Sequence, residues 1–409
     1  MNYQIINGGV TAAKGFQATG TEAGIKYANR KDMAMIYSEE PCVAAATFTT
    51  NVVKAAPVLW DKQIVDNAPF LQAVVVNAGI ANAGTGQQGM EICEATAKKA
   101  ADVLHIPANA VAVGSTGVIG MQVPVDKIKA GIEKMVPKLG GTLEDGLIAA
   151  QSIMTTDTIS KEAAVTFEIG GKTVTLGGMC KGSGMIHPNM CTMLGYLTTD
   201  LNISKELLAK ALKEDVQDTF NMITVDGDTS TNDTLLILAN GLAGNPEITS
   251  ENEDYAIFKE ALNYVNQTLA KMMAGDGEGA TALIEVKVIN ADTKENAKLL
   301  SKSVVGSSLT KAAIYGHDSN WGRILCALGY SGAQFNPNIV DIAYEGNGKK
   351  IQVCQKSMMV DYSEAEATEI LSSPEVTILV NMNAGTASAT AWGCDLTYDY
   401  VKINADYRS

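Results

Sequence analysis

The sequence predicts an α+β fold in which helices and sheets stack as helix–sheet–sheet–helix layers, with two interleaved halves. Three observations predict it: β-like runs alternate with amphipathic helical runs, glycine-containing turns join some of the β-like runs, and other runs are almost continuously apolar. Runs of the last kind are typical of strands in sheets that are covered on both faces. No repeat and no linker rich in proline or serine divides the chain into separate domains.

The alternation of strand and helix is clearest in the first half of the chain. Residues 73–77 have the apolar β-like sequence AVVVN, and an amphipathic helix is expected across 89–104. The next β-like run, VAVGSTGVIG at 111–120, is expected to enter a turn at its Ser-Thr-Gly. The longest helix is expected across 252–273, where apolar residues recur at steps of three and four. A shorter run at 193–196, Met-Leu-Gly-Tyr, also has a helix-like pattern.

Two antiparallel hairpins and three covered strands are expected in the remaining segments. Gly170-Gly171 and Asn347-Gly348 each lie between two β-like runs, and such dipeptides favour tight hairpin turns. The almost continuously apolar runs are TLLILAN at 234–240, TALIEVKVIN at 281–290 and VTILVNMN at 376–383.

Composition excludes several classes of function. The 409 residues have a net charge of −14 and no concentration of Lys and Arg, so nucleic acid is not an expected partner. The N-terminus has no basic segment followed by an apolar run, and no run is long and apolar enough to span a membrane. We therefore expect a soluble, cytoplasmic protein. Seven scattered cysteines without a C-x-x-C pair, and three dispersed histidines, favour neither a disulfide framework nor a metal site.

Three short motifs have ordinary interpretations. The glycine-rich KGSGM at 181–185 lacks the spacing of a phosphate-binding loop, so we interpret it as a loop that needs positive φ. Ser308 and Lys311 match the S-x-x-K of penicillin-recognising enzymes, but no K-T-G follows them. His187 precedes Cys191 by four residues, and a loop histidine beside a small buried thiol is favoured over a catalytic pair.

Two segments rich in acidic and hydroxyl side chains, and one isolated glutamate, are further candidates for functional positions. The sequence TVDGDTSTNDT at 224–234 resembles a calcium loop but lacks its terminal glutamate, so a polar turn beside the active region is expected. TTDT at 155–158 is interpreted as a helix cap, with a hydroxyl-lined subsite as the alternative. Glu278, between Gly277 and Gly279, is either a turn residue or a charge that points into a cleft, and the sequence leaves both open.

Two threonines are candidates for acyl-transfer chemistry. The turn expected at Thr116 presents a hydroxyl beside a backbone N–H, which is the donor pair that an oxyanion site requires. Thr192 needs a base to act as a nucleophile, and no His/Asp pair is spaced to serve it. If the peptide bond between Cys191 and Thr192 is cut, Thr192 gains an α-amine with a pKa of about 7.7–8.0 beside its own hydroxyl. Thr192 would then be nucleophile and base together.

Ten blocks, in order over the whole chain, resemble the ornithine acetyltransferase family of arginine biosynthesis. They include GGVTAAKGF, NAGIANAGTGQQG, GSTGVIG, KGSGMIHPNMCTML, TVDGDTSTNDT, GHDSNWGRI and the C-terminal YVKINADYRS. The resemblance implies the layered fold of ornithine acetyltransferases and DmpA-type enzymes, and a precursor that cleaves itself before a threonine. That threonine is Thr192 in this sequence. The implied products are an α chain of residues 1–191 and a β chain of residues 192–409 that stay associated.

The resemblance also implies roles for individual residues. Thr116 and Gly117 would form the oxyanion hole through a hydroxyl and a backbone N–H, and Cys191 and Thr192 would flank the cleaved bond. Lys181 and Glu278 have opposite charges, which suits a substrate that carries both a carboxylate and a side-chain ammonium. The full set of residues implied to bind the amino-acid substrate is Thr155, Lys181, Thr192, Glu278, Asn404 and Ser409.

The implied reaction is a ping-pong acetyl transfer from N2-acetylornithine to glutamate that needs no cofactor or metal. The Thr192 hydroxyl attacks the acetyl carbonyl while its amine takes the proton, and glutamate then accepts the acetyl group. The resemblance leaves open whether acetyl-CoA is a second donor, and it implies a heterotetramer of two α and two β chains. The alternatives are a hydrolase or aminopeptidase on the same self-cleaving scaffold and an uncleaved binding protein.

This sequence departs from the family pattern at a few positions. Cys191 stands where the family usually has alanine, and His187 where it often has alanine. A thiol at position 191 is expected to leave the attack on its carbonyl intact. Ala78 and Gly84 replace a serine and a cysteine that are common in the family, and these changes are expected to affect packing only.

Overall fold

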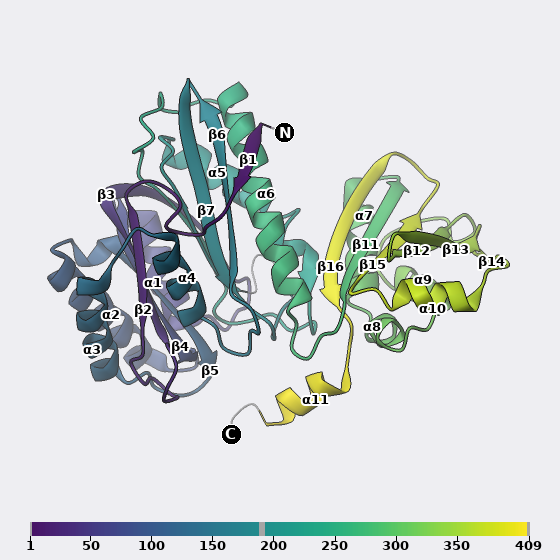
Figure 1. Ribbon diagram of the computed structural model, residues 1–409, viewed down its shortest axis with the longest axis horizontal. Coiled ribbons are helices and arrows are strands. Elements are labelled where there is room, and N and C mark those ends of the chain that lie inside the picture. The colour runs from purple at the N-terminus through teal and green to yellow at the C-terminus, as the bar shows by residue number, and fades with distance from the viewer. Residues whose placement is uncertain (1, 188–192, 407–409) are drawn as a thin grey trace. The chain divides into compact units, whose positions relative to one another are not determined.

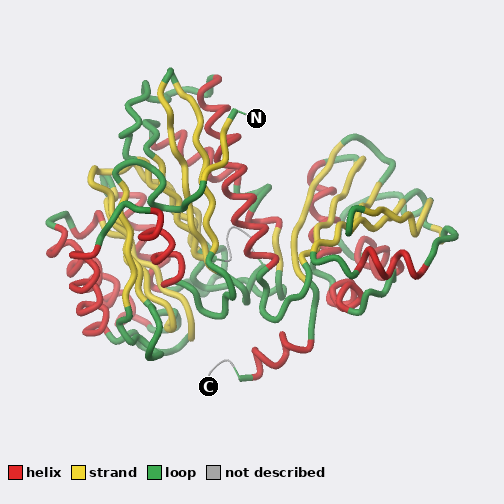
Figure 2. Tube along the Cα trace, in the orientation of Figure 1, coloured by secondary structure: helices red, strands yellow, loops and turns green. Residues whose placement is uncertain are grey.

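The computed structural model describes residues 2–187 and 193–406, which form two compact units. Unit 1 comprises residues 2–182, 193–220 and 229–269, and unit 2 comprises residues 183–187, 221–228 and 270–406. Each unit combines a sheet with helices, and Figure 2 shows strands and helices mixed in both. The predicted α+β class is therefore confirmed. The two units are interleaved along the sequence, as predicted, because two short segments of unit 2 interrupt unit 1.

The strands of unit 1 are β1 (Tyr3–Ile6), β2 (Phe16–Thr21), β3 (Met33–Phe48), β4 (Leu71–Ile80), β5 (Val111–Val118), β6 (Lys161–Ile169), β7 (Lys172–Lys181), β8 (Leu194–Thr199) and β10 (Thr234–Ala239). Its helices are α1 (Ala56–Asn67), α2 (Gly86–Leu104), α3 (Val125–Met135), α4 (Leu143–Ser152), α5 (Lys205–Asp215) and α6 (Glu253–Gly275), the last residues of which belong to unit 2. Helix α6 agrees closely with the helix predicted across 252–273.

The described strands of unit 1 form a nine-stranded sheet in the order β1-β6-β7-β8-β10-β3-β4-β5, with β2 also paired to β3. The long strand β3 changes partners along its length. Residues 33–38 pair with β2, the overlapping stretch 33–37 pairs with β4, and residues 43–48 pair with β10. The exposed residues 39–41 lie between the two sets of pairs. Strand β3 therefore belongs to both halves of the sheet: the first half also contains β2, β4 and β5, and the second also contains β1, β6, β7, β8 and β10.

The two halves of this sheet pack against each other, with helices outside. Val74 and Val76 of β4 lie in one apolar cluster with Leu236 of β10. Val75 points to the opposite face of β4 and lies in a second cluster with Ile132 of α3 and several residues of α2. Because both faces are covered, all ten residues of β4 are buried.

Helix α6 covers the outer face of the second half. The ring centroids of Phe167 in β6 and Phe258 in α6 lie 6.4 Å apart, and the Cys180 thiol of β7 donates to the Leu269 carbonyl of α6 at 3.7 Å. Figure 1 shows α6 beside β6 and β7, with α1, α2 and α3 grouped on the far side of unit 1. The predicted helix–sheet–sheet–helix layering is therefore confirmed within unit 1.

The strands of unit 2 are β9 (Ile223–Thr224), β11 (Leu283–Ala291), β12 (Asp341–Gly346), β13 (Lys349–Gln355), β14 (Met358–Met359), β15 (Glu375–Asn381) and β16 (Ala387–Cys394). They form a sheet in the order β14-β13-β12-β15-β11-β16-β9. The helices of unit 2 are α7 (Lys294–Val305), α8 (Ser308–Tyr315), α9 (Trp321–Gly329), α10 (Glu364–Leu371) and α11 (Tyr398–Ala405).

Both predicted hairpins are confirmed. Gly170-Gly171 joins β6 to β7, and Asn347-Gly348 joins β12 to β13. All four turn residues have positive φ, between 51° and 74°. That conformation is the one a two-residue turn needs to match the twist of its strands, and it explains why these residue types occupy the turns.

Two local predictions are wrong. Residues 194–199 form strand β8 rather than the expected helix, because β7 and β10 pair with it on either side and bury all six residues. The expected turn at Ser115-Thr116-Gly117 is also absent, since β5 continues through it to Val118 in parallel register with β4. Pairing with distant strands overrode the local pattern in both cases.

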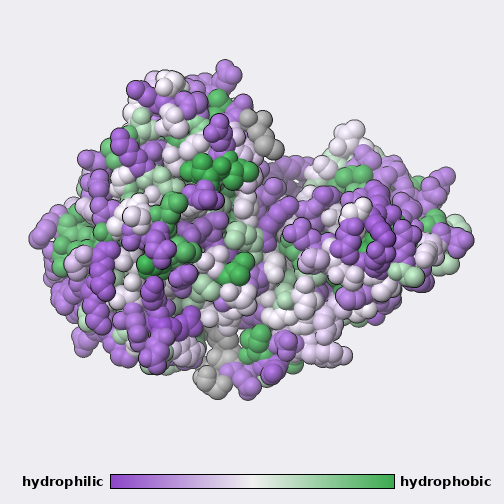
Figure 3. Space-filling view, in the orientation of Figure 1, coloured by the Kyte–Doolittle hydropathy of each residue, from purple (hydrophilic) through white to green (hydrophobic). Residues whose placement is uncertain are grey.

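The surface in view is mostly hydrophilic, with hydrophobic residues in small groups (Figure 3). Among the described helices, none has the length and apolar character that a membrane crossing requires. The described cysteines are free thiols, and Cys326 alone among them is exposed.

Candidate active site

Strand β5 carries the two residues predicted to form an oxyanion hole, Thr116 and Gly117. Gly117 has a φ of 127°, and a Cβ added to it would lie 2.2 Å from the carbonyl carbon of Gly79 in the neighbouring strand β4. Only glycine fits this approach of the two backbones. Just before it, the Ser115 hydroxyl donates to the Asn77 side chain at 2.7 Å, which ties β5 to β4 again. Thr116 and Gly117 therefore occupy a closely specified stretch of backbone.

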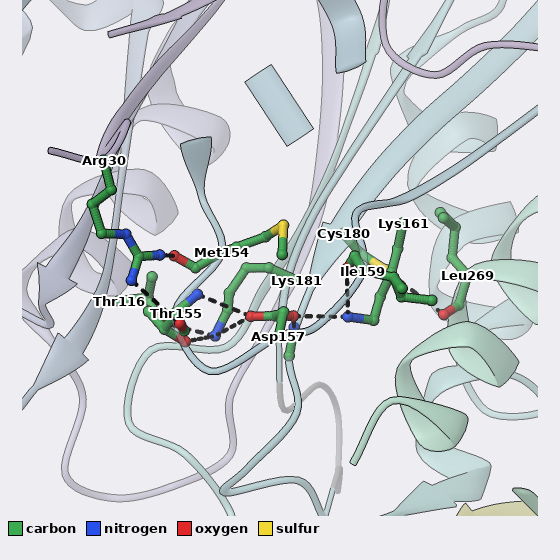
Figure 4. A network of polar contacts seen from close by, with 11 residues as sticks. Arg30, Thr116, Met154, Thr155, Asp157, Ile159, Lys161, Cys180, Lys181 and Leu269 are labelled. Carbon is green, nitrogen blue, oxygen red and sulfur yellow. Dashed lines mark hydrogen bonds and ion pairs between the residues drawn. The ribbon is translucent and has the colours of Figure 1, made fainter. Parts of the chain in front are cut away.

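Lys181, the last residue of β7, joins two of the predicted site threonines. Its Nζ donates to the Thr155 hydroxyl at 2.9 Å and to the Thr116 hydroxyl at 3.4 Å. Figure 4 shows the three side chains converging, although they come from β7, from the loop after α4 and from β5. The structure thus brings together three residues that are far apart in the sequence.

The prediction that segment 155–158 is a helix cap is wrong, because the segment lies between α4 and β6 and no helix begins there. The alternative interpretation, a hydroxyl-bearing subsite, fits the contact between Thr155 and Lys181. The loop is also held by Arg30, whose guanidinium donates to the carbonyls of Met154 at 2.6 Å and Thr155 at 3.4 Å. A shallow depression of about 600 Å³ on this side is lined by Arg30, Lys31, Gln151, Met154 and residues 158–160.

Asp157 connects this loop to the end of β7. Its Oδ2 accepts the Thr155 N–H at 3.0 Å, and its Oδ1 accepts the Gly182 N–H at 2.7 Å and the Lys161 ammonium at 2.8 Å. Burial alone would raise the pKa of Asp157, but the charges of Lys181 and Lys161 and these hydrogen bonds outweigh it and hold the pKa well below its ordinary value. The carboxylate is therefore ionised.

Asp233 is a second buried carboxyl group in unit 1. It hydrogen-bonds with the side chains of Thr49 and Ser230 and accepts the backbone N–H of Met193. Burial raises its pKa well above the ordinary value, although these bonds and the charge of Lys181 oppose the change. Its Oδ2 has no hydrogen-bond partner in the described part of the chain. The predicted polar turn thus contains a side chain that holds the backbone N–H of Met193, the residue after position 192.

In unit 2, Glu278 and Asn404 lie together. The Asn404 amide of α11 donates to Glu278 Oε2 at 2.7 Å, and the backbone N–H of Glu278 donates to the Ser183 carbonyl at 2.8 Å. Glu278 is only 6% exposed, and a Cβ on Gly184 would lie 2.4 Å from its carboxylate. Glu278 is therefore a buried carboxyl group packed against the glycine-rich segment, not merely a turn residue.

Asp226 holds the other side of this segment in unit 2. Its carboxylate accepts the backbone N–H groups of Met185 at 2.6 Å and Ile186 at 2.8 Å, and the Tyr400 hydroxyl at 3.2 Å. His187 Nδ1 lies 3.0 Å from the Thr224 hydroxyl, and burial lowers the pKa of His187 to about 4. The acidic run therefore organises a loop. Within the described ranges, no group of three His, Cys, Asp or Glu side chains could hold a metal ion.

Three predicted site residues, Cys191, Thr192 and Ser409, lie outside the described residues. The others form two groups: Thr116, Thr155 and Lys181 in unit 1, with Gly117 next to Thr116, and Glu278 with Asn404 in unit 2. The S-x-x-K motif has a different explanation, because Lys311 is buried in α8 and donates to the Cys394 carbonyl.

Sequence reasoning missed Asp157, Lys161 and Arg30. Asp157 and Lys161 are four residues apart, a spacing that also occurs in solvated surface pairs, so the sequence gives no sign of their burial. Arg30 is separated from the loop it holds by about 125 residues, and no short-range pattern links them. The one available signal was the density of polar residues in TTDT itself.

Comparison with known proteins places the whole chain in one family. The family model described as the ArgJ family matches residues 17–409. The chain is 52% identical to arginine biosynthesis bifunctional protein ArgJ 1 of Clostridium acetobutylicum, over 98% of each chain. It is 50% identical to arginine biosynthesis bifunctional protein ArgJ of Caldanaerobacter subterraneus subsp. tengcongensis, over 99% of this chain and 100% of the relative.

The solved structures with similarity to this chain include an ornithine acetyltransferase complexed with ornithine, from Mycobacterium tuberculosis. It is 41% identical, with a TM-score of 0.43, and the match covers 47% of this chain and 100% of the other chain. The family model and the two full-length relatives confirm the resemblance that the sequence motifs predict: the chain belongs to the ArgJ family, and it is an enzyme.

Proposed function

We propose that this protein transfers the acetyl group of N2-acetylornithine to glutamate, in the cyclic route of arginine biosynthesis in the cytoplasm. Thr192 is the nucleophile in this scheme, and its free α-amine is the base. The proposal is supported by membership of the ArgJ family and by the names of its full-length relatives. The single structural observation that carries it is the Lys181 ammonium, which lies within hydrogen-bond distance of both Thr155 and Thr116.

Each described site residue has a part in the proposed reaction. Thr116 and Gly117 stabilise the negative oxygen that develops when Thr192 attacks the acetyl carbonyl, through a hydroxyl and a backbone N–H. Lys181 binds the carboxylate of the amino-acid substrate, with Thr155 beside it. Glu278, held by Asn404, binds the side-chain ammonium of the acetylornithine. Ser409 completes the proposed set of substrate contacts. Ornithine then leaves, and glutamate accepts the acetyl group from the threonine ester.

The same hydroxyl provides the proposed self-cleavage. Attack of Thr192 Oγ on the Cys191 carbonyl breaks the peptide bond and forms an ester, which water hydrolyses to give an α chain ending at Cys191 and a β chain beginning at Thr192. We propose a heterotetramer of two α and two β chains as the mature form. None of these steps requires a cofactor or a metal ion.

The test combines mass spectrometry with an acetyl-transfer assay. Purified protein is expected to contain a polypeptide that begins at Thr192, and to form N-acetylglutamate and ornithine from N2-acetylornithine only when glutamate is present. Thr192→Ala is expected to remain full length and inactive. Release of acetate and ornithine without glutamate would instead indicate the hydrolase. A processed or active Thr192→Ala variant would exclude the proposed nucleophile, and a second assay with acetyl-CoA and glutamate determines whether acetyl-CoA is also a donor.

A further inference from the structure

Two oppositely charged side chains next to Lys181 are completely buried. Lys161 Nζ donates to Asp157 Oδ1 at 2.8 Å, and the exposed fraction of both side chains is 0%. Figure 4 shows Asp157 between Lys161 on one side and Lys181 on the other. A buried ion pair is often no more stabilising than apolar residues of the same volume, because both charges lose their hydration. The presence of this pair therefore suggests a role besides stability.

The contacts of Asp157 fix the place of Lys181. One oxygen accepts the N–H of Gly182, the residue after Lys181, and the other accepts the N–H of Thr155. The second oxygen also lies 3.8 Å from Lys181 Nζ. A single carboxylate thus holds the end of β7, the Thr155 loop and the Lys181 ammonium together. A substrate-binding side chain is effective only when its own position is fixed in this way.

Lys161 determines the net charge of the cluster. With Lys161 present, two ammonium groups share one carboxylate, so the three side chains carry a net charge of about +1 at neutral pH. Without it, Asp157 would neutralise Lys181, and an approaching anion would meet no net charge. Asp233 also interacts electrostatically with Lys181, and burial raises the pKa of Asp233, which favours its neutral form. The side chain of Lys181 is 9% exposed.

We propose that Asp157 and Lys161 are positioning residues for Lys181, which set both its location and the positive charge that it presents to the substrate carboxylate. This inference rests on the proposed function, since it takes Lys181 as the contact for that carboxylate. It adds a determinant of specificity: the enzyme prefers an amino acid with a free α-carboxylate because Lys161 keeps the Lys181 charge from being cancelled.

The experiment compares two substrates that differ only in that charge. N2-acetylornithine and its α-carboxamide analogue are assayed with saturating glutamate, and kcat and KM are measured for each. The variants are Lys161→Met, the double variant Asp157→Asn/Lys161→Met, and Lys311→Met as a control that also removes a buried lysine ammonium. Thermal unfolding of each variant checks that it is folded.

Lys161→Met is expected to raise the KM for N2-acetylornithine about tenfold or more. Its kcat is expected to change by less than about threefold, and the KM for the carboxamide to stay the same, because only charge recognition is lost. The double variant is expected to recover only part of the preference for the carboxylate, since Lys181 is again uncompensated but the carboxylate that fixes its position is lost. Lys311→Met is expected to keep the wild-type ratio of the two KM values.

An unchanged ratio in folded Lys161→Met overturns the inference, as does an equal rise in both KM values, which is the result of a purely structural role. If Lys161→Met does not fold, Lys161→Gln carries the test, because it removes the same charge and keeps a side-chain N–H that can donate to Asp157: the preference for the carboxylate must fall, and an unchanged preference overturns the inference. Failure of the wild-type protein to make N-acetylglutamate is a different result, because it contradicts the proposed function itself.

Discussion

Glu162 and Asp233 are carboxyl groups that the fold shields from water, Glu162 in part and Asp233 almost completely. Each has one oxygen without a hydrogen-bond partner in the described ranges. Burial raises the pKa of both. They differ in their other contacts. Asp233 accepts the Met193 N–H, whereas the raised pKa of Glu162 is explained by burial. One of them therefore affects stability alone, and the other also bears on the predicted nucleophile.

Glu162→Gln is expected to stabilise the protein above neutral pH. Burial raises the pKa of Glu162 to about 7, against about 4.3 for an unperturbed glutamate. The protonated form is favoured in the folded state, so the contribution of Glu162 to stability is complete below about pH 4.3 and is lost as the pH rises through 7. A neutral glutamine avoids this loss, and with allowance for partial exposure the gain is about 1–2 kcal/mol at pH 8.

Urea unfolding at pH 5 and pH 8 measures this effect. The difference between Glu162→Gln and wild type is expected to be much larger at pH 8. Glu94→Gln on the exposed face of α2 is the control, because it also removes one negative charge. Equal stabilisation by the two variants at pH 8 would mean that net charge, and not burial of Glu162, is responsible.

Asp233→Ala is expected to slow both self-cleavage and acetyl transfer. The variant removes the acceptor of the Met193 N–H, and Met193 follows the predicted nucleophile directly. A misplaced reacting group costs about 10²-fold in rate, and the lost hydrogen bonds cost about 1–3 kcal/mol of stability. Asp61→Ala is the matched control, since Asp61 is equally buried, accepts the Val113 N–H at 2.8 Å and also has one oxygen without a partner in the described ranges.

Mass spectrometry of the β-chain N-terminus and thermal unfolding distinguish the two variants. Both are expected to lose stability, but only Asp233→Ala is expected to accumulate full-length protein. Equal processing in the two variants would show that the bond to Met193 has no effect on the nucleophile.

At this scale the sequence predicts residue types better than their partners. The family resemblance assigns Thr116, Thr155 and Lys181 to the site, and the structure brings all three together. Asp157 was hidden in a segment that reads as a helix cap, because short hydroxyl and carboxyl residues satisfy backbone N–H groups in caps and loops alike. The burial of Lys161 depends on the whole fold, so it cannot be predicted from the residues next to Lys161 in the sequence.

Strand β5 shows how an element places a functional backbone group. It runs parallel to β4 with Gly117 opposite Gly79, and the lack of a side chain at Gly117 allows an approach that no larger residue permits there. The predicted oxyanion N–H therefore depends on the fit between two strands, and the Ser-Thr-Gly sequence that predicts it is part of that fit.

Gly117→Ala is expected to destabilise the protein by about 3 kcal/mol or more and to lower kcat. The added methyl group would overlap the Gly79 carbonyl, and the alanine backbone would also have to adopt a φ of 127°. Gly120→Ala separates the two causes, since Gly120 has a φ of 83° with open space around its Cβ position. That variant is expected to cost only about 1 kcal/mol. Urea unfolding of both variants measures the difference, and similar losses would exclude the backbone overlap as the cause.

Hairpins were predictable at the scale of elements, whereas strand β8 was not. The turn residues Gly170-Gly171 and Asn347-Gly348 adopt positive φ, so a dipeptide of this kind between two β-like runs is sufficient to predict each hairpin. Residues 194–199 are a short apolar run, which periodicity alone cannot assign to helix or strand. Their partners β7 and β10 decide the outcome, and β10 begins about 35 residues later.

At the scale of the whole molecule, the sheet of unit 1 is built from both sides of position 192. Strands β8 and β10 follow that position, yet they lie in the sheet between β7 and β3, which precede it. Helix α6 also follows it and contacts β1 and β6, through Tyr264 against Tyr3 and Phe258 against Phe167. The interleaving was predictable from the absence of a linker, but the boundary of the units near residue 269 was not, since it falls inside a continuous helix.

This arrangement predicts that, in the proposed cleaved form, the α and β chains separate only when the protein unfolds. Strand β8 forms six residue pairs with β7 and six with β10, and all the residues of β8 and β10 are buried. Pulling a β chain of residues 192–409 away from residues 1–191 would expose two edges in the middle of the sheet, together with both apolar faces of the gap. The cleaved chains are therefore expected to co-elute in size-exclusion chromatography without denaturant.

Urea unfolding followed by circular dichroism tests the coupling between separation and unfolding. Because unfolding of the cleaved protein also dissociates its chains, its midpoint is expected to rise with protein concentration more steeply than that of uncleaved Thr192→Ala, in which the chain stays continuous. Association of whole subunits adds the same dependence to both proteins, so the comparison isolates the contribution of the cut. Equal slopes, or release of a folded β chain before the unfolding transition, would show that β8 and β10 are not held in the sheet as the structure indicates.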